Sequence, residues 1–528
     1  MILKVETKNN YSMKVTAIKK KLNEFDDLSF VENMYKHFQK IRDPKNGIVS
    51  NFPWCCFLAM KWKFTEPHKL HVKNMRERDF VNIVNAIYNL QVDASDLLEG
   101  NKILLSIRRM IINQMLYQAS MRMELNTLAR QYYWYCNYQG GYFERSFLER
   151  FNISLENYYK ISAYFLIVSC VEDNKESNFL SVNVYLIHLV PYFGAETLKA
   201  FLNLVSVKFS DLRGFMSEYK DIKQRDVEYY QDTPMLNKPM ILMSDGVLTL
   251  SKHILRAALA ELVPSLLKKE FAASYKDRFG KVMEKYVGDI LSELPSDVIT
   301  EDSIKDLYRE HKKTGKVVDY IVKEGCSSVY IDSKAIEPEK TVKSSNFALH
   351  IKERLKNSFI KGVLQGQECA RILNEVNNKN PCSNDSLIII IHKDHYIPTG
   401  KMIEDVLDPT IFSLIEKKHG SLAIKKERIY YMTIEEFERL IEVCKVKDIT
   451  ITSVIDACLD NDSDPNTQKF NVMMHLNKIA PGGVPDRDNI IKSKEYLFDE
   501  ILESMGESSS NWDGKVEEFL QIRNYLMM

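Results

Sequence analysis

The chain has 528 residues, of which 45% are hydrophobic and 27% are charged, and its 72 basic side chains equal its 72 acidic ones. This composition is typical of a soluble globular protein of two or three domains, and it excludes a polycation. Nine cysteines without a Cys-x-x-Cys pair, no recognisable signal peptide and no bilayer-spanning apolar run predict a cytoplasmic protein without disulfides or structural zinc.

Residues 1–235 are predicted to form a mainly α-helical N-terminal domain. Apolar residues recur at helical spacing over residues 80–90, 102–135, 154–171 and 195–209. Aromatic residues are dense between 131 and 143, where a base-stacking platform is the alternative to the helical core that we favour. We expect this domain to recognise a target, to dock a partner protein or to regulate the rest of the chain.

A second domain is predicted over residues 236–400, and its first element is a hairpin. Two short apolar runs flank Gly246, which we expect to supply the left-handed turn position. Helices are predicted next over 251–271 and 279–291. Glu284 borders the apolar stripe of the later helix, so it can enter a site on the sheet against which that helix packs.

The most informative segments are two apolar runs of strand length at 317–322 and 329–335. Alternation along the second run puts Asp332 and Lys334 on the same face of a strand. If the two runs pair as a hairpin, Asp319 approaches that face. Two carboxylates and an ammonium group at the end of an apolar sheet suit a hard divalent cation and an activated water. The alternative is an amphipathic strand that exposes Asp332 and Lys334 to water.

A long helix is predicted downstream over 347–377, and Lys361 and Gln365 lie in its polar row. An almost wholly apolar strand follows at 386–392, of the kind that is buried on both faces. Residues 401–528 are predicted to add a strand and several helices, which complete the second domain or pack on it.

This order of elements resembles the PD-(D/E)xK, or restriction-endonuclease-like, nuclease superfamily over about residues 275–395, roughly a quarter of the chain. The residues that carry the resemblance are Glu284 on the first helix, Asp319 on one strand, Asp332-Ser333-Lys334 on the next strand, and Gln365 or Gln367 on the helix that follows. The chain departs from the family pattern at two places: Val318 stands where the motif has proline, and Asp332 stands where glutamate is commoner.

The resemblance implies an α/β (α+β) core, with a mixed central sheet flanked by helices. It also implies that Asp319 and Asp332 bind Mg²⁺, with Glu284 and Ser333 as further ligands, and that Mn²⁺ substitutes for it. Lys334 would orient or polarise the attacking water, and Gln365 would belong to the same site. Because all these ligands are oxygens, Mg²⁺ is favoured over Zn²⁺.

The expected activity is hydrolysis of phosphodiester bonds by a DNA endonuclease, with double-stranded DNA as the expected substrate. A local excess of positive charge begins at the predicted catalytic strand. Its candidate phosphate-binding residues are Lys340, Lys343, Lys352, Arg354 and Lys361. The alternative is a lysine-rich loop and helix face that is merely solvated.

A nuclease of this build resembles bacterial restriction or anti-phage defence enzymes. Two alternatives stay open: a nuclease that acts on RNA, and a non-catalytic nucleic-acid-binding or scaffolding protein of the same fold. The partners expected besides nucleic acid are a second copy of the chain or a protein that docks on residues 1–235.

Overall fold

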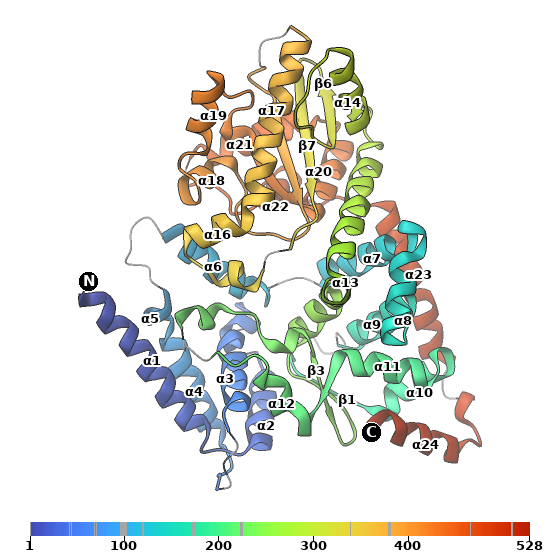
Figure 1. Cartoon of the computed structure of the whole chain (residues 1–528). Helices are drawn as coiled ribbons and strands as arrows, with labels where there is room; N and C mark the ends of the chain where they lie inside the picture. The colour runs from blue at the N-terminus through green and yellow to red at the C-terminus, as the bar shows by residue number, and fades with distance from the viewer. Residues whose placement is uncertain are drawn as a thin grey trace. The chain divides into compact units, whose positions relative to one another are not determined.

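The computed structural model describes residues 2–41, 43, 45–67, 69, 71–95, 103–118, 121–169, 175–221, 225–337, 339–378, 382–464, 466–507 and 510–528. They form a mainly helical protein with two mixed β-sheets (Figure 1). The chain divides into two compact units. Unit 1 consists of residues 1–96, 110–272 and 488–528, and unit 2 consists of residues 97–109 and 273–487.

The boundaries between these two units differ from the domain boundaries that we predicted at residues 235 and 400. The hairpin of β3 (Met240–Met243) and β4 (Gly246–Thr249) belongs to unit 1, because β4 pairs with β1 (Asn178–Ser181) and β3 pairs with β2 (Ser206–Lys208). The segment after residue 400 is also split, since residues 401–487 continue unit 2 and residues 488–528 return to unit 1.

Unit 1 combines this four-stranded sheet, in the order β1–β4–β3–β2, with many helices. Its helices are α1 (Ile2–Leu22), α2 (Asp27–Phe38), α3 (Pro53–Thr65), α4 (Glu77–Asn89), α5 (Gln91–Ser95), α7 (Met121–Asn137), α8 (Tyr142–Phe151), α9 (Leu155–Val168), α10 (Val182–Phe193), α11 (Ala195–Val205), α12 (Leu212–Ser217), α23 (Asp488–Glu507) and α24 (Val516–Met527). Two more helices, α6 (Ile103–Met115) and α13 (Lys252–Leu291), contain residues of both units.

The predicted helix over 102–135 is wrong as a single element, because a turn follows α6 at 116–118 before α7 begins. That turn consists of Leu-Tyr-Gln, which carries no helix-breaking residue. Residue 102 and residues 170–171, at predicted helix ends, lie outside the described residues. The two helices predicted over 251–271 and 279–291 are confirmed: both lie within α13, in which two helices meet at a kink at Ala272 (φ 37°, ψ −106°).

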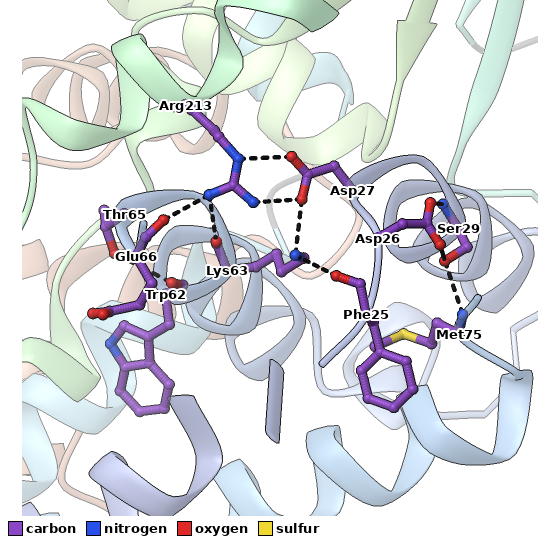
Figure 2. A network of polar contacts seen from close by, with 10 residues as sticks. All are labelled: Phe25, Asp26, Asp27, Ser29, Trp62, Lys63, Thr65, Glu66, Met75 and Arg213. Atoms are coloured by element: carbon purple, nitrogen blue, oxygen red, sulfur yellow. Dashed lines mark hydrogen bonds and ion pairs between the residues drawn. The ribbon is translucent and has the colours of Figure 1, made fainter. Parts of the chain in front are cut away.

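A partly buried polar network ties the beginning of α2 to α3 and α12 in unit 1 (Figure 2). Arg213 donates two hydrogen bonds to the Asp27 carboxylate, at 2.7 and 2.5 Å, and a third to the Glu66 carbonyl at 2.6 Å. Lys63 lies 2.8 Å from the same carboxylate and donates to the Phe25 carbonyl at 2.7 Å. Each charge of this network therefore has an opposite charge or a carbonyl beside it, which burial requires.

The sheet of unit 2 has five strands, β5 (Asp297–Thr300), β6 (Tyr320–Glu324), β7 (Ser327–Lys334), β8 (Ser386–Ile391) and β9 (Ile429–Thr433), in that order. The neighbours β5, β6 and β7 are antiparallel, whereas β7, β8 and β9 are parallel. The predicted β6–β7 hairpin and the buried strand β8 are therefore confirmed. Tyr320 pairs with Ile331, and Lys334 at the end of β7 pairs with Ile391 of β8.

Helices cover both faces of this sheet, which explains why β8 is apolar throughout. The helices of unit 2 are α14 (Glu301–Glu310), α15 (Lys340–Ser344), α16 (Ala348–Leu355), α17 (Lys361–Val376), α18 (Gly400–Val406), α19 (Ile411–His419), α20 (Ile434–Lys447), α21 (Ile451–Asp462) and α22 (Val472–Ile479), and a π-helical turn (Lys356–Ile360) joins α16 to α17. Leu387 and Ile389 of β8 share a core with α16–α19, whereas Tyr430 of β9 bonds Asp462 of α21 at 3.3 Å.

The helix α17 lies directly on the centre of the sheet (Figure 1). A Cβ added at Gly366 would lie 2.5 Å from Leu387, and one at Gly362 would lie 2.8 Å from Ile389, so glycine permits this close approach. Among the described helices of the whole chain, none has the length and apolar content that crossing a membrane requires.

Candidate active site at the end of strand β7

The candidate residues of unit 2 gather where β7 ends and β6 begins. Asp332, Ser333 and Lys334 are the last three residues of β7, and Asp319 directly precedes β6. Because the two strands are antiparallel neighbours, the end of one lies beside the start of the other. Residues that are 13 to 15 positions apart in the sequence therefore meet where these two strands end and begin.

Asp319 is held in place by Ser333. The backbone N–H and the hydroxyl of Ser333 both donate to Asp319 Oδ2 at 2.6 Å. Burial nevertheless raises the pKa of Asp319, although these two hydrogen bonds and the charge of Lys334 oppose the rise. The Ser333 side chain thus orients the candidate ligand Asp319.

Asp332 is the most unusual group of this region. Its side chain is 0% exposed and forms an ion pair with the Lys334 ammonium group. The ammonium group lies against Oδ2, whereas Oδ1 accepts no hydrogen bond from any residue that the structure describes. Burial raises the pKa of Asp332 from 3.8 to about 7, and the negative charge of Asp319 adds to the rise while Lys334 opposes it. A buried carboxylate of this kind is costly unless a cation completes it.

Glu284 approaches the same region from α13. Burial raises the pKa of Glu284, and the negative charge of Asp319 raises it further. The Tyr320 hydroxyl donates to the Glu284 backbone carbonyl at 3.1 Å, which fixes this turn of α13 against the start of β6. The charges of Glu284 and Asp319 therefore act on one another.

The two glutamines of α17 have different roles. Gln365 donates to the Val317 carbonyl at 3.2 Å, two residues before Asp319, and its buried Oε1 accepts no hydrogen bond from a described residue. Gln367 instead bonds the backbone of Ala423 and Ile424 through three hydrogen bonds of 2.6 to 3.1 Å. Gln365 therefore lies near the start of β6, whereas Gln367 fixes a loop.

The five predicted phosphate-binding residues lie on three consecutive helices. Lys340 and Lys343 belong to α15, Lys352 and Arg354 to α16, and Lys361 begins α17. Lys352 forms an ion pair with Asp408 at 3.0 Å, and Arg354 forms one with Glu339 at 3.4 Å. The positive charge of Lys361 acts on the Asp332 carboxylate and favours its ionised form.

Two acidic residues near Glu284 were not predicted from the sequence. Glu301 and Asp302 form the first turn of α14, and their negative charges contribute to the raised pKa of Glu284. The sequence signal for this position is a helix start. Thr300 caps α14 by accepting a hydrogen bond from the Ser303 N–H, and two acidic residues follow it in the first turn.

The donor set fits a hard cation. Within the described part of the chain, no three His, Cys, Asp or Glu side chains converge as a ready-made metal cluster. Asp319 and Asp332 instead contact the protein donors Ser333 and Lys334. All the candidate ligand atoms are oxygens, and Oδ1 of the buried Asp332 has no hydrogen-bond donor among the described residues, so the chemistry suits Mg²⁺ or Mn²⁺.

Comparisons with known proteins add no family to this description. The chain matches no protein-family model, no curated protein and no solved structure.

Proposed function

We propose that the chain is a metal-dependent DNA endonuclease whose chemistry takes place at the end of β7 in unit 2. The order of elements supports this: the helix with Glu284, the β6–β7 hairpin, a helical segment and the parallel strand β8 follow one another. The strand β5 and α14 stand between the first helix and the hairpin, and the helical segment consists of α15, α16 and α17. The resemblance to the PD-(D/E)xK superfamily implies the same order around Asp319 and Asp332-Ser333-Lys334.

The observation that carries the proposal is the environment of Asp332. A fully buried carboxylate with a pKa of about 7 reduces the stability of the fold at neutral pH. Strongly perturbed carboxylates of this kind concentrate at functional sites, because a catalytic role requires the group despite its cost. A structural strand position of the same burial would be served better by an apolar residue.

Asp319 and Asp332 would hold Mg²⁺, with Glu284 as a further or water-mediated ligand. When bound, the ion would stabilise negative charge on the phosphate and lower the pKa of a coordinated water. Ser333 keeps Asp319 oriented through the two bonds to Oδ2. The chain's own groups therefore position the carboxylates before any cation arrives.

Lys334 supplies the positive charge of the site. Its ammonium group lies against Asp332 and is mostly buried, with a side-chain exposure of 16%. From this position it would orient the attacking water and offset negative charge on the scissile phosphate. Lys361, whose charge also acts on Asp332, would hold the neighbouring phosphate, together with Lys340 and Lys343 of α15.

Lys352 and Arg354 already have acidic partners, and DNA would have to compete with those acids for them. By analogy with bacterial restriction and anti-phage enzymes, we propose that unit 1 supplies target recognition or partner docking.

The direct test is cleavage of supercoiled plasmid, single-stranded DNA and RNA with Mg²⁺, Mn²⁺ or EDTA. We expect metal-dependent nicking or linearisation of duplex DNA. Asp332→Asn and Lys334→Met should reduce the rate at least about a hundredfold, because each removes charge that the transition state needs. DNA affinity should persist in both variants.

Matched surface substitutions control for general damage. Asp306→Asn and Lys313→Met each remove one partner of an exposed ion pair and should leave the rate unchanged. Cleavage of RNA without cleavage of DNA would mean that the substrate is RNA. Unchanged cleavage in Asp332→Asn would reject the site, and DNA binding without cleavage of any substrate would favour a scaffolding protein.

A further inference from the structure

Unit 2 contains a cavity of about 300 Å³ that the proposed nuclease site does not use. It lies between α17 and α19 and is bordered by the segment 421–423 and by Lys316. Asp319, Asp332 and Lys334 are not among its lining residues. This volume is at the lower end of the range of pockets that hold small molecules.

The walls of the cavity are aliphatic. The apolar lining residues are Ile360, Leu364, Ile411, Leu414, Ile415 and Ala423, and no aromatic side chain other than the His419 ring lines it. Leu414 is 60% exposed, so apolar surface of the cavity reaches solvent. Walls of branched aliphatic side chains suit a saturated chain better than a planar base, which prefers an aromatic ring to stack on.

Basic side chains border this aliphatic lining. Arg371 of α17 and Lys418 and His419 of α19 line the cavity, with Lys316 beside them. Desolvation and the positive charges of Arg371 and Lys418 lower the pKa of His419, whereas the negative charges of Glu368 and Glu375 oppose this, which places these groups close to one another. The three basic residues Lys316, Arg371 and Lys418 outnumber the two acidic lining residues, and a net positive charge at the border of an apolar cavity attracts an anionic ligand.

The two acidic residues that line the cavity, Glu368 and Asp408, already contact other groups of the protein. Glu368 accepts the Lys316 N–H at 3.2 Å. Asp408 forms its ion pair with Lys352 and accepts the Thr410 hydroxyl at 2.9 Å. The ion pair with Lys352 offsets the charge of Asp408. Arg371 forms an ion pair with Glu375 of its own helix through Nη1, while its buried Nε has no hydrogen-bond partner among the described residues.

We infer that this cavity binds an aliphatic anion, a molecule with a saturated apolar tail and a carboxylate or phosphate head. The tail packs between Leu364, Ile411 and Ile415, and the head lies at Arg371 and Lys418. The site is separate from the one at Asp332, and its occupancy does not depend on the proposed nuclease activity. An occupant contacts α17, the helix that begins at Lys361.

Calorimetric titration of the full chain with decanoate and with decyl phosphate tests this inference. Decanol serves as the uncharged analogue and AMP as the planar anion. We expect one equivalent of each aliphatic anion to bind, at least about tenfold more tightly than decanol, because the head group meets charged donors. The tighter of the two anions identifies the preferred head group.

Variants separate this cavity from non-specific association. Arg371→Met with Lys418→Met should weaken both anions at least about tenfold and leave decanol unchanged. Ile415→Glu should abolish binding of all three, because it places a negative charge in the aliphatic wall. The surface variant Arg309→Met should bind as the parent does, and circular dichroism should confirm that each variant is folded.

Three results would overturn the inference. They are the absence of binding by either aliphatic anion, tighter binding of AMP than of decanoate, and equal anion affinity in the parent and the Arg371→Met, Lys418→Met protein.

Discussion

Replacing Asp332 by asparagine should stabilise unit 2 at neutral and alkaline pH while it abolishes cleavage. Asparagine has nearly the same shape as aspartate but carries no charge. In the native protein the Asp332 carboxylate is fully buried, and burial together with the charge of Asp319 outweighs the Lys334 ion pair, so its ionisation destabilises the fold. A substitution that removes a catalytic group and raises stability is the expected trade-off at an active site.

The size of the effect follows from the pKa of Asp332. Its ordinary value is 3.8 and the value in the fold is about 7, so the folded state binds more protons than the unfolded state between those limits. The stability of the metal-free protein therefore falls as the pH rises through this window, by about 1.4 kcal/mol per pH unit. The stability difference between the variant and the parent should accordingly grow by about 3 kcal/mol from pH 5 to pH 8.

Scanning calorimetry in EDTA at several pH values measures this difference. All four tryptophans, at positions 54, 62, 134 and 512, belong to unit 1, so their fluorescence identifies the unfolding transition of that unit. The effect of Asp332→Asn should appear only in the unfolding transition of unit 2, to which Asp332 belongs. There an increment of about 3 kcal/mol raises the midpoint by roughly 6–12 °C.

A variant that is less stable than the parent at pH 8, or a difference that does not change with pH, would refute the reasoning. Either result would mean that the Asp332–Lys334 pair stabilises the fold and that the carboxylate carries no electrostatic strain. The exposed substitution Asp306→Asn should show no comparable pH dependence.

Further predictions concern other parts of the molecule. Arg213→Met should destabilise unit 1 by about 2 kcal/mol in urea unfolding followed by tryptophan fluorescence, because the partly buried Asp27 loses its bidentate partner and keeps only Lys63; an unchanged midpoint would contradict this. Gly246→Ala should cost about 1–3 kcal/mol in the same assay, since a Cβ there would lie 2.2 Å from the Leu180 carbonyl oxygen, and tolerance of alanine would show that β1 can move away. Mg²⁺ at a hundred times its dissociation constant should stabilise the parent by about 2.7 kcal/mol and leave Asp332→Asn unaffected.

The sequence was sufficient for the elements that form the candidate site. Alternation along residues 329–334 and the turn at Gly325 predict the β6–β7 hairpin, and the apolar run of residues 386–391 predicts a strand buried on both faces, because each pattern is local. The proximity of Asp319 to the end of β7 follows from the hairpin alone.

Other features depend on pairings that leave no local pattern. Residues 240–249 read as the start of the second domain, yet their hydrogen bonds are to strands at 178–181 and 206–208. Gly246 was expected to occupy the left-handed turn position; it is instead the first residue of β4, where the close approach of β1 requires glycine. No periodicity reports a contact between strands that are 30 or more residues apart.

The electrostatics of the site were equally hidden. Folding brings Lys352 beside Asp408 and Arg354 beside Glu339. A count of charges along the sequence therefore overstates the net positive charge of the predicted patch. The choice between Gln365 and Gln367 also required the structure, because both lie on α17. Only the contact with the loop at 423–424 shows that the Gln367 amide is already hydrogen-bonded to the backbone.

Binding of Mn²⁺, followed by electron paramagnetic resonance in the absence of nucleic acid, tests most directly whether Asp332 and its neighbours hold a divalent cation. At pH 8 the parent protein and Asp306→Asn should bind Mn²⁺ equally, and Asp332→Asn should bind it at least about a hundredfold more weakly. At pH 6 the affinity of the parent should fall about tenfold, because Asp332 is then mostly protonated. Equal Mn²⁺ affinity in the parent and in Asp332→Asn at both pH values would contradict the proposed metal site.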